Sequence, residues 1–566
     1  MVKPLLIILF VLYSTVYLYG QDIQQIGKGK PFSITGALNL GSAWNFTNAA
    51  SSPYNKSSYN INCSPTLNFY SFSLPFTIYY TNNSSGFNHP FNRIGVSPTY
   101  KWLKVHLGYR SINVSPYVMS GKIMLGGGLE LTPGRLRFAV LGGRLEKAQE
   151  EDTLAAKGLP PTYERYGCGG KIGAGASANS YIDLFFFQGR DVLKSLATPV
   201  KSDVHPAENI AGGFALSSPI GKRFVWVTTV AFSFYTRDVY ARNDDSLNKL
   251  SRYFENDYIH LNFSSQYLTA GESFLRYNGS GGSFTFKYKR IDPDYKTMAT
   301  FYQQSDISEY SLLFNRGLFK NKISLSGNFS TSEDNIYRAR NTLTTRNSGG
   351  LMIGYNGGGK LTMELNLLAF NLYQSYLHNP VGDSLKLNQL NKMISGGIHY
   401  TIDKPLTSNV ISVGAGYNGS SNLNPEYIYD YSTLNTNYNV SFSTLLKGSK
   451  ISVSEIVSMN INTSRTTNVN SKTFGENLGK AWAKDKLNTN LSVSYTSSSL
   501  NGAIYGSSIN LQGGISLRPN KNNTLGLNGG IVDNIAVGKS GVWFSTFNIR
   551  YTLNFNQFSP AKKNVK

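Results

Sequence analysis

The segment that most constrains the fold lies near the C-terminus, where apolar and polar residues alternate without interruption over Phe547-Asn-Ile-Arg-Tyr-Thr-Leu-Asn-Phe555. Because side chains alternate across a β-strand, this segment has one apolar face and one polar face. A soluble sandwich can contain such a strand, and so can a membrane barrel, whose strands are apolar toward lipid and polar toward the lumen. As the closing strand of a barrel, the segment has five predicted lipid-facing residues: Phe547, Ile549, Tyr551, Leu553 and Phe555.

The N-terminus favours the membrane barrel because it has the features of an export signal. Lys3 precedes an apolar run from Leu5 to Val16, and the small residue Gly20 precedes the polar Gln21. A positive charge, an apolar run and a small residue before a polar start make a cleavable signal peptide over residues 1–20. The run is too short for a membrane-spanning helix. These features predict an exported protein of the outer membrane of a Gram-negative bacterium.

The hydropathy of the remaining chain suits strands rather than membrane helices. After residue 20, no segment approaches the roughly 18 consecutive apolar residues that a transmembrane helix needs. The mean hydropathy of −0.24 and the hydrophobic content of 40% would by themselves suggest a soluble protein. A barrel gives similar values, because half of each strand faces a polar interior. The 55 Gly, 37 Tyr and 32 Phe residues suit tight turns and aromatic girdles.

Short and long connections alternate along the chain, as they do in transmembrane barrels. The short ones are rich in Gly, Asn and Pro, as tight hairpins require. They are predicted at residues 70–71, 132–134, 219–222, 278–281, 356–359, 447–449 and 520–522. The longer polar connections are predicted at 44–58, 83–92, 148–165, 191–207, 237–264, 291–307, 333–344, 375–389, 418–430 and 464–472.

This spacing predicts an all-β fold: a single large antiparallel transmembrane β-barrel of about 26 strands, within a range of 22 to 28. The barrel is expected over residues 31–556, with both termini in the periplasm and a short basic periplasmic tail over residues 557–566. A string of soluble β-sandwiches is the alternative. It would need linkers between domains, which the sequence lacks.

The interior of such a barrel must be filled or constricted, because a barrel of more than twenty strands has a wide lumen. Only residues 21–30 separate the mature N-terminus from the first strand, so the sequence predicts a short periplasmic segment and no N-terminal plug domain. Three connections have short helical patterns that suit inward folding: residues 149–157, 191–196 and 244–254. The alternatives are ordinary external loop helices and a partner protein seated in the barrel.

Basic residues on the polar faces of predicted strands are the candidates for the lumen lining. They are His106, Arg110, Lys287, Lys289 and Arg550. A lining of fixed cations attracts anions and repels cations. The alternative is that these charges are solvated and pair with loop carboxylates.

The charge of the whole chain points to anionic partners. It has 54 basic against 32 acidic residues. In a soluble protein this balance would suggest nucleic acid, but an exported β-rich chain with no binding motif does not favour that partner. Outer-membrane lipids with anionic lipopolysaccharide, acidic polymers, or a cation-lined lumen account better for the charge.

No pattern indicates catalysis or a cofactor. The six histidines lack metal-ligand spacing, and Asn356-Gly-Gly-Gly-Lys360 lacks the spacing of a phosphate loop. Cys63 and Cys168 are far apart in the sequence, so a disulfide is allowed by the compartment but not indicated. The charged run from Lys289 to Lys296 is expected to pin a loop through Arg–Asp pairs. We therefore expect no enzyme and no catalytic, metal or cofactor-binding residues.

Three stretches together carry a resemblance to a known family. They are PFNRIGVSPTYKWLKVHLGYRSINVSPY (90–117), GGGLELTPGRLRFAVLGGRLEKA (126–148) and KYKRIDPDYKTMATFYQQSD (287–306). They resemble a family of uncharacterised Bacteroidota outer-membrane β-barrel proteins, which are signal-bearing, plug-less large barrels. The resemblance covers about the first 60% of the chain and implies location and fold, with no catalytic residues to transfer. By analogy with this family, the resemblance also suggests a role in surface-protein export that depends on a partner protein.

Three functions fit this sequence. The first is a channel or transport protein for hydrophilic cargo, including anions, whose lumen is constricted by inward loops. The second is a partner-filled barrel in a surface-protein export or assembly machinery, with a lumen-bound or periplasmic protein partner. The third is a structural or adhesive barrel with a closed pore. For all three, we expect the outer-membrane barrel assembly machinery to be a partner during biogenesis.

Overall fold

The computed structural model describes residues 32–49, 57–82, 92–151, 161–177, 179–196, 204–242, 260–301, 304–377, 382, 385–426, 432–538 and 541–556. The predicted signal peptide, the segment 21–30 and the basic tail 557–566 lie outside these residues. Every extended regular element in the described residues is a β-strand. No described helix is long and apolar enough to cross a membrane.

The strands have the following bounds: β1 Ser33–Thr47, β2 Ser57–Cys63, β3 Thr66–Phe69, β4 Phe72–Thr81, β5 Arg93–Val96, β6 Thr99–Tyr100, β7 Leu103–Arg110, β8 Met119–Ser120, β9 Met124–Leu131, β10 Leu136–Glu146, β11 Arg165–Ser177, β12 Ser180–Asp191, β13 Glu208–Ile220, β14 Phe224–Thr236, β15 Ser265–Gly279, β16 Gly282–Ile291, β17 Ala299–Thr300, β18 Ile307–Leu318, β19 Ile323–Glu333, β20 Thr342–Asn356, β21 Leu361–Tyr376, β22 Asn388–Asp403, β23 Thr407–Asn422, β24 Thr433–Leu446, β25 Ile451–Ser464, β26 Asn468–Trp482, β27 Leu487–Leu500, β28 Ala503–Asn520, β29 Asn523–Ala536 and β30 Val542–Asn556.

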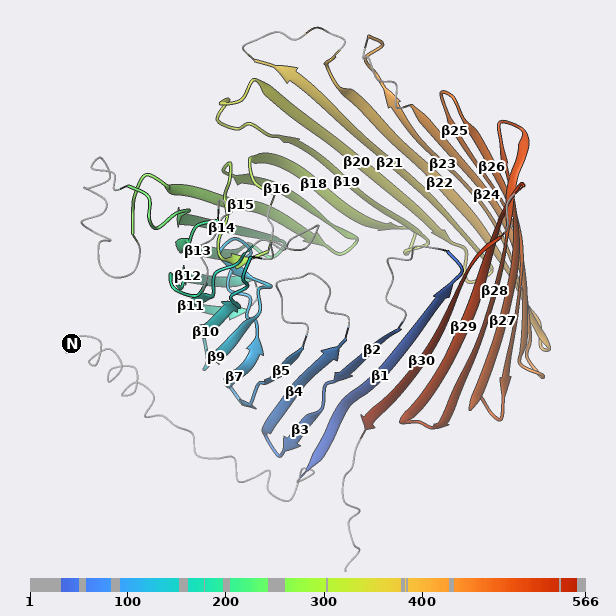
Figure 1. The fold of residues 1–566 in the computed structure, drawn as a ribbon, viewed down its shortest axis with the longest axis horizontal. Coiled ribbons are helices and arrows are strands. Elements are labelled where there is room, and N and C mark those ends of the chain that lie inside the picture. Colours follow the sequence, from blue (N-terminus) through green and yellow to red (C-terminus); the bar gives the residue numbers. More distant parts are fainter. Residues whose placement is uncertain are drawn as a thin grey trace, which may run out of the picture.

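The described strands form one closed antiparallel barrel (Figure 1). The last strand pairs with the first, from Thr35 opposite Asn556 to Thr47 opposite Phe544. Across this seam, the rings of Trp44 and Phe547 stack with their centroids 5.7 Å apart. The segments β2 and β3 make one interrupted strand, as do β5 and β6, so the ring has 26 strands. The predicted fold class and strand count are confirmed.

Short turns gather at one rim of the barrel and most longer connections at the other, as the sequence predicts. All seven predicted short turns join neighbouring strands, beginning with the turn at residues 70–71 between β3 and β4. We call this end the turn rim and the opposite end the loop rim. At the turn between β13 and β14, Gly221 has a φ of 65°, a conformation that glycine adopts at little cost.

Two connections differ from the prediction. The expected long connection at 464–472 is short, since β25 ends at Ser464 and β26 begins at Asn468. Because the first residues of β26 are mostly polar, on both faces, the sequence shows no alternation that would mark where this strand begins. Conversely, residues 111–123 between β7 and β9 form a long connection that the pattern does not predict. Its apolar residues Val114, Tyr117 and Val118 resemble a strand in sequence.

The register assigns each side chain to one face of the sheet, because directly paired residues point to the same side. Phe224 and Trp226 share their face with Tyr277 and Leu275, and these in turn with Phe284 and Phe286. When the pairing is traced from strand to strand as far as β30, the five apolar residues of β30 lie on this same face. We call it the outer face.

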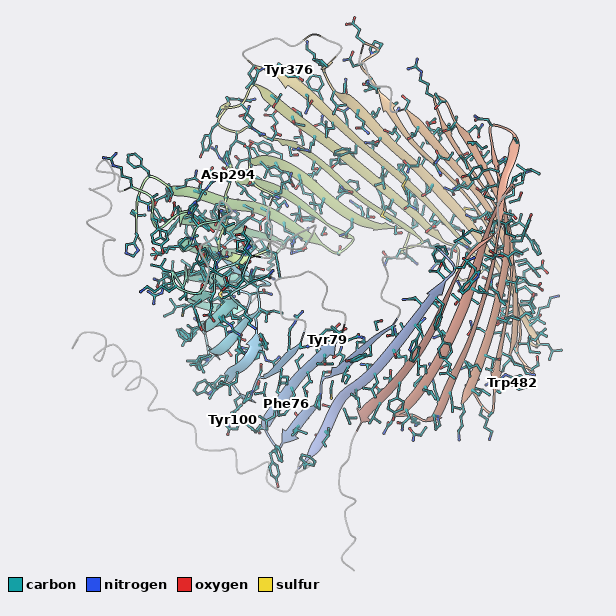
Figure 2. The ribbon with its side chains drawn as sticks, in the orientation of Figure 1. Phe76, Tyr79, Tyr100, Asp294, Tyr376 and Trp482 are labelled. Atoms are coloured by element: carbon teal, nitrogen blue, oxygen red, sulfur yellow. The ribbon has the colours of Figure 1, made fainter. Side chains whose placement is uncertain are left out.

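Side chains stand on both faces of the wall in Figure 2, with Tyr79 on the interior side and Trp482 on the outer side. The outer face carries most of the exposed large apolar side chains, among them Phe214, Val230 and Phe286. It is not uniformly apolar, since Glu455 lies directly opposite Glu476 on it. The alternation predicted for β30 thus belongs to a pattern that runs around the ring.

Candidate functional site inside the barrel

Two connections from the loop rim fold back onto the interior side of the wall formed by β10 to β16 (Figure 1). They are residues 111–123, between β7 and β9, and residues 292–301, between β16 and β18. Their short strands β8 and β17 pair in parallel, with Met119 opposite Ala299 and Ser120 opposite Thr300. We call these two segments together the insert.

The insert and the wall behind it make the hydrophobic core of the described residues. Val118, Met119 and Ala299 of the insert are fully buried. They belong to one cluster with inward-facing wall residues, which include Leu141, Phe187, Ala211, Ala231 and Ala270. Burial of this apolar surface holds the insert against the wall, since each buried side chain of this size contributes about 1.5–3 kcal/mol.

Small wall residues let the insert approach closely. A Cβ atom added to Gly169 of β11 would lie 2.9 Å from the sulfur of Met119. A Cβ atom on Gly189 of β12 would lie 3.1 Å from the sulfur of Met298. Larger residues at these positions would push the insert away from the wall. These glycines therefore leave room both for the insert and for the ring of Phe187 on the wall.

Hydrogen bonds fix the two segments to each other and to the wall. The Tyr295 hydroxyl donates to the carbonyl of Tyr117 over 3.0 Å, and the Thr297 hydroxyl donates to the carbonyl of Val118 over 3.0 Å. From the wall, the side-chain oxygen of Asn209 accepts the Met298 amide at 3.1 Å. Burial raises the pKa of Tyr295 above its ordinary value, which keeps the hydroxyl protonated as a donor.

A chain of ion pairs ties the end of the insert to the loop rim. The Lys122 ammonium lies 2.7 Å from the Glu146 carboxylate, and both side chains are largely buried. Arg165 contacts the same carboxylate at 3.3 Å and that of Asp191 at 2.7 Å. Removing one partner from a buried pair of this kind costs about 3–5 kcal/mol, because it leaves a buried charge unpaired.

The charged run at residues 289–296 does pin a connection, as its composition predicts. Arg237 lies 3.0 Å from Asp294, and Arg290 lies 3.9 Å from Asp292. The Tyr337 hydroxyl donates to Asp292 over 2.8 Å. This hydrogen bond is the main reason why the pKa of Tyr337 is raised.

The segments predicted to fold inward are not the ones that form the insert. Residues 191–196 end β12 and then make a turn, with the Ser195 amide donating to the carbonyl of Val192, so the predicted helix there is wrong. The helices predicted at 149–157 and 244–254 fall largely or wholly outside the described residues. The insert has no regular period, and its only sequence signal is a run of apolar residues beside Pro and Gly.

The five sequence-predicted basic residues share one face of the sheet, the face that also contacts the insert. Lys287 and Lys289 lie opposite Phe274 and Glu272, on the side away from Phe286. Lys287 and Lys289 approach Glu309 of β18 at 3.7 and 3.6 Å. The carboxylates that face these lysines in the described residues, Glu309 and Glu272, therefore belong to strands and not to loops.

His106 and Arg110 lie on the same face of β7, in different surroundings. His106 is buried between the Ser97 hydroxyl at 3.1 Å and the Glu130 carboxylate at 2.5 Å. The Arg110 guanidinium instead donates to the Thr77 hydroxyl over 3.0 Å and to the carbonyl of Pro75 over 3.3 Å. Among the described residues, both hydrogen-bond acceptors of Arg110 are therefore uncharged.

Two cavities open along this part of the interior. One of about 550 Å³ lies beside the ends of the insert, which contribute Ser111 and Ile123. Its other lining residues are Asn62, Thr77, Tyr79, Arg93, Ser97, Lys104, His106, Tyr109 and Arg110. The second, of about 440 Å³, lies at the seam and includes Arg550 together with Tyr79. Neither described lining contains an aspartate or a glutamate.

The opposite part of the interior is uncharged. On the inner face of β23 to β29, the described residues between the two rims include no Lys, Arg, Asp or Glu. Amides and hydroxyls occupy most of these positions, and some bond across strands, as Asn435 does to Asn460 over 3.1 Å and Thr473 to Thr496 over 2.8 Å. The interior thus has a charged side that holds the insert and a neutral hydrogen-bonding side.

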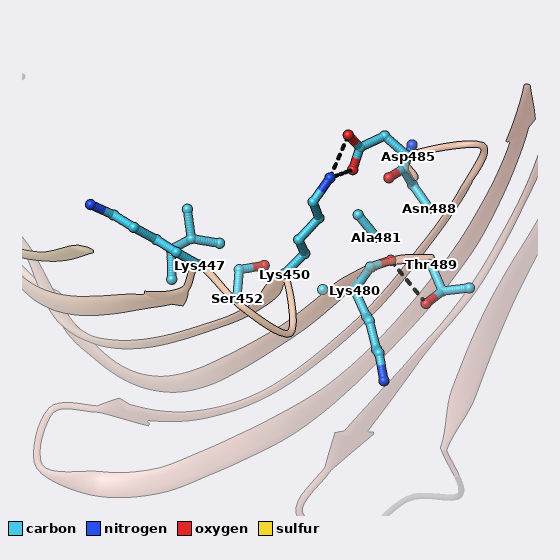
Figure 3. Close-up of a pocket in the computed structure, with 10 residues that line it drawn as sticks. Lys447, Lys450, Ser452, Lys480, Ala481, Asp485, Asn488 and Thr489 are labelled. Atoms are coloured by element: carbon cyan, nitrogen blue, oxygen red, sulfur yellow. Dashed lines mark hydrogen bonds and ion pairs between the residues drawn. The ribbon is translucent and has the colours of Figure 1, made fainter. Parts of the chain in front are cut away.

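A further cavity lies at the turn rim and is a surface feature. It lies between the turns that follow β24 and β26 (Figure 3). Lys450 contacts both carboxylate oxygens of Asp485, at 2.7 and 2.6 Å, and both side chains are about half exposed. An exposed pair of this kind contributes little to stability and has no unmatched charge to offer a ligand.

The assignment of faces makes a prediction for single cysteines in a background without Cys63 and Cys168. In proteoliposomes, Arg550→Cys and Lys287→Cys should react with a charged maleimide, because their side chains contact the aqueous interior. The adjacent Ile549→Cys and Phe286→Cys should resist that reagent and react with a lipid-soluble one. The reverse pattern at either pair would show that the face assignment is wrong for that strand, since a slip of one residue exchanges the faces.

No family model and no curated protein matches this chain. Among solved structures, it is similar to the translocation pore of the P pilus usher PapC, with 10% identity, 93% of this chain and 99% of that chain covered, and a TM-score of 0.39. It is similar to OccAB2 of Acinetobacter baumannii, with 10% identity, 93% and 100% covered, and a TM-score of 0.30. It is also similar to OpdK of Pseudomonas aeruginosa with vanillate, with 7% identity, 62% and 93% covered, and a TM-score of 0.30. At these identities and scores, the likeness does not extend to function.

Proposed function

We propose that this protein is a channel of the Gram-negative outer membrane that passes hydrophilic cargo through a lumen narrowed by the insert. The observation that carries this proposal is the two-sided interior. The insert occupies the charged side, against β10 to β16, and the neutral wall of β23 to β29 has amides and hydroxyls but no fixed charge between the rims. Such a surface exchanges hydrogen bonds with a polar solute without holding it tightly.

The outer face supports the membrane location. Its exposed aromatic and aliphatic side chains would cost free energy in water, at about 25 cal/mol for each Å² of apolar surface, and they are stable against lipid. A closed ring leaves no unpaired strand edge, which the hydrocarbon layer requires. In this setting, outer-membrane lipids surround the barrel, and the barrel assembly machinery inserts it.

The test is conductance in planar bilayers, for the full-length protein and for a variant in which residues 113–121 are replaced by a short Gly-Ser linker. The wild type should show stable open steps, and the variant should show steps several-fold larger, because the insert is removed from the lumen. Shortening the connection between β23 and β24 by a similar length is the matched control and should leave the step size unchanged.

Two results would contradict the proposal. A wild type that never conducts, and a variant that does not conduct either, would indicate a closed structural barrel. A protein that stably co-purifies in mild detergent, and whose removal is needed before any current appears, would indicate a barrel filled by a partner. Heat-modifiable migration on gels shows that each variant is assembled before its current is measured.

A further inference from the structure

We propose that the cavity lined by Arg93, Lys104 and Arg110 is a binding site for a phosphate or carboxylate group of the cargo. This inference rests on the proposed function, because it adds an anion-binding step inside the channel. The three cations come from neighbouring strands, β5 and β7, and face one cavity of about 550 Å³ whose described lining has no acidic residue. We call this cavity the anion site.

Arg110 differs from the interior arginines Arg137 and Arg165 in its partners. Arg137 holds Asp183 at 2.8 Å, and Arg165 holds Asp191 at 2.7 Å. Arg110, in contrast, has no carboxylate partner among the described residues and contacts only Thr77 and the carbonyl of Pro75. Its Nε–H is removed from solvent and has no hydrogen-bond partner there. That atom lies against the backbone at Gly95, so the part of Arg110 that suits an oxyanion is the charge of its guanidinium, which no described carboxylate balances.

The neighbouring backbone makes room for this guanidinium. A Cβ atom added to Gly95 would lie 2.8 Å from Nε of Arg110 and 2.7 Å from the carbonyl oxygen of Tyr109. Any side chain at position 95 would therefore displace the arginine. Because position 95 is a glycine, the Arg110 side chain can lie over the strand and line the cavity.

Near the site, Arg110 keeps a charge that no described carboxylate balances. Glu130 neutralises Lys104, 3.0 Å away, and accepts a hydrogen bond from His106, but it does not line the cavity. Arg550 adds a further cation to the adjoining seam cavity, and Tyr79 lines both. The anion site therefore lies on the interior side of β5 and β7, beside the ends of the insert, which suits the capture of an acidic group on an otherwise neutral polar cargo.

The test uses inorganic pyrophosphate as the probe and two independent measurements. Pyrophosphate should block wild-type conductance and should bind the detergent-purified barrel in titration calorimetry. Arg110→Gln should weaken both effects by about tenfold or more, the value of a hydrogen-bonded charge. Arg276→Gln is the matched control, since Arg276 lies on the interior face of β15 and outside the cavity. It should stay within about twofold of the wild type, which is a few tenths of a kcal/mol.

Arg110→Lys keeps the charge but loses the planar set of donors, so it should bind pyrophosphate more weakly than the wild type and more tightly than Arg110→Gln. If the glutamine variant does not assemble, weakened binding in the lysine variant supports the site, and wild-type binding overturns it. Equal losses in Arg110→Gln and Arg276→Gln would show a general charge effect and would also overturn it. Conductance without pyrophosphate binding would refute the anion site and leave the proposed channel intact.

Discussion

Truncation after Asn548 should abolish assembly of the barrel completely. It removes the part of β30 that pairs with β1 from Thr35 to Ser42 and with β29 on its other side. The ring would then have two strand edges with unpaired N–H and C=O groups in hydrocarbon, at a cost of several kcal/mol for each group. The heat-modifiable band on gels should be absent, and protease should degrade the chain.

The matched control is removal of residues 559–566, which leaves β30 whole and should assemble as the wild type does. This comparison separates loss of the seam from loss of chain length. Normal assembly without residues 549–566 would mean that β30 does not close the ring. Failure of the control would instead assign a role in assembly to the basic tail.

The second large effect is expected from Glu146→Gln, which should release the insert from the wall. The substitution keeps the size of the side chain but leaves the buried Lys122 ammonium without its carboxylate, 2.7 Å away, and weakens the hold on Arg165. The free energy that keeps the insert docked should fall by about 3 kcal/mol. This corresponds to a rise of about a hundredfold in the population with the insert undocked.

Undocking can be measured by maleimide labelling of Val118→Cys in a background without Cys63 and Cys168. Val118 is fully buried, so labelling reports opening of the insert. The control is Glu333→Gln, which breaks an exposed pair with Arg338 at 3.5 Å and should change the rate little. Equal labelling rates with Glu and Gln at position 146 would show that this ion pair does not hold the insert.

The strand pattern was predictable because it is local. Period-two alternation assigns residues such as Phe284 and Lys287 to opposite faces, and Gly, Asn and Pro mark the turns. The predicted count of 26 strands agrees with the structure. The errors occur where the local pattern misleads, as at 464–472, where both faces of the strand are polar, and at 111–123, where an aperiodic apolar segment resembles a strand.

The candidate site was only partly predictable, since the type of a residue does not give its partner. His106 and Arg110 are four residues apart and lie on one face of β7, and both appear in the sequence as basic residues of a polar face. The fold gives His106 a carboxylate, Glu130, and gives Arg110 only neutral acceptors. The charge that is free to bind an anion is thus decided by the neighbouring strands.

The sequence by itself determined the architecture. It has strands of alternating polarity, which short and long connections join in turn, and a last strand, with Phe547 to Phe555, that closes the ring. Only the tertiary structure decided what lies inside. The insert joins Tyr117 to Tyr295, 178 residues apart, and its burial depends on the space left by Gly169 and Gly189 on other strands. Alternation follows from the geometry of a single strand, whereas packing inside the ring depends on contacts between segments that become neighbours only when the ring closes.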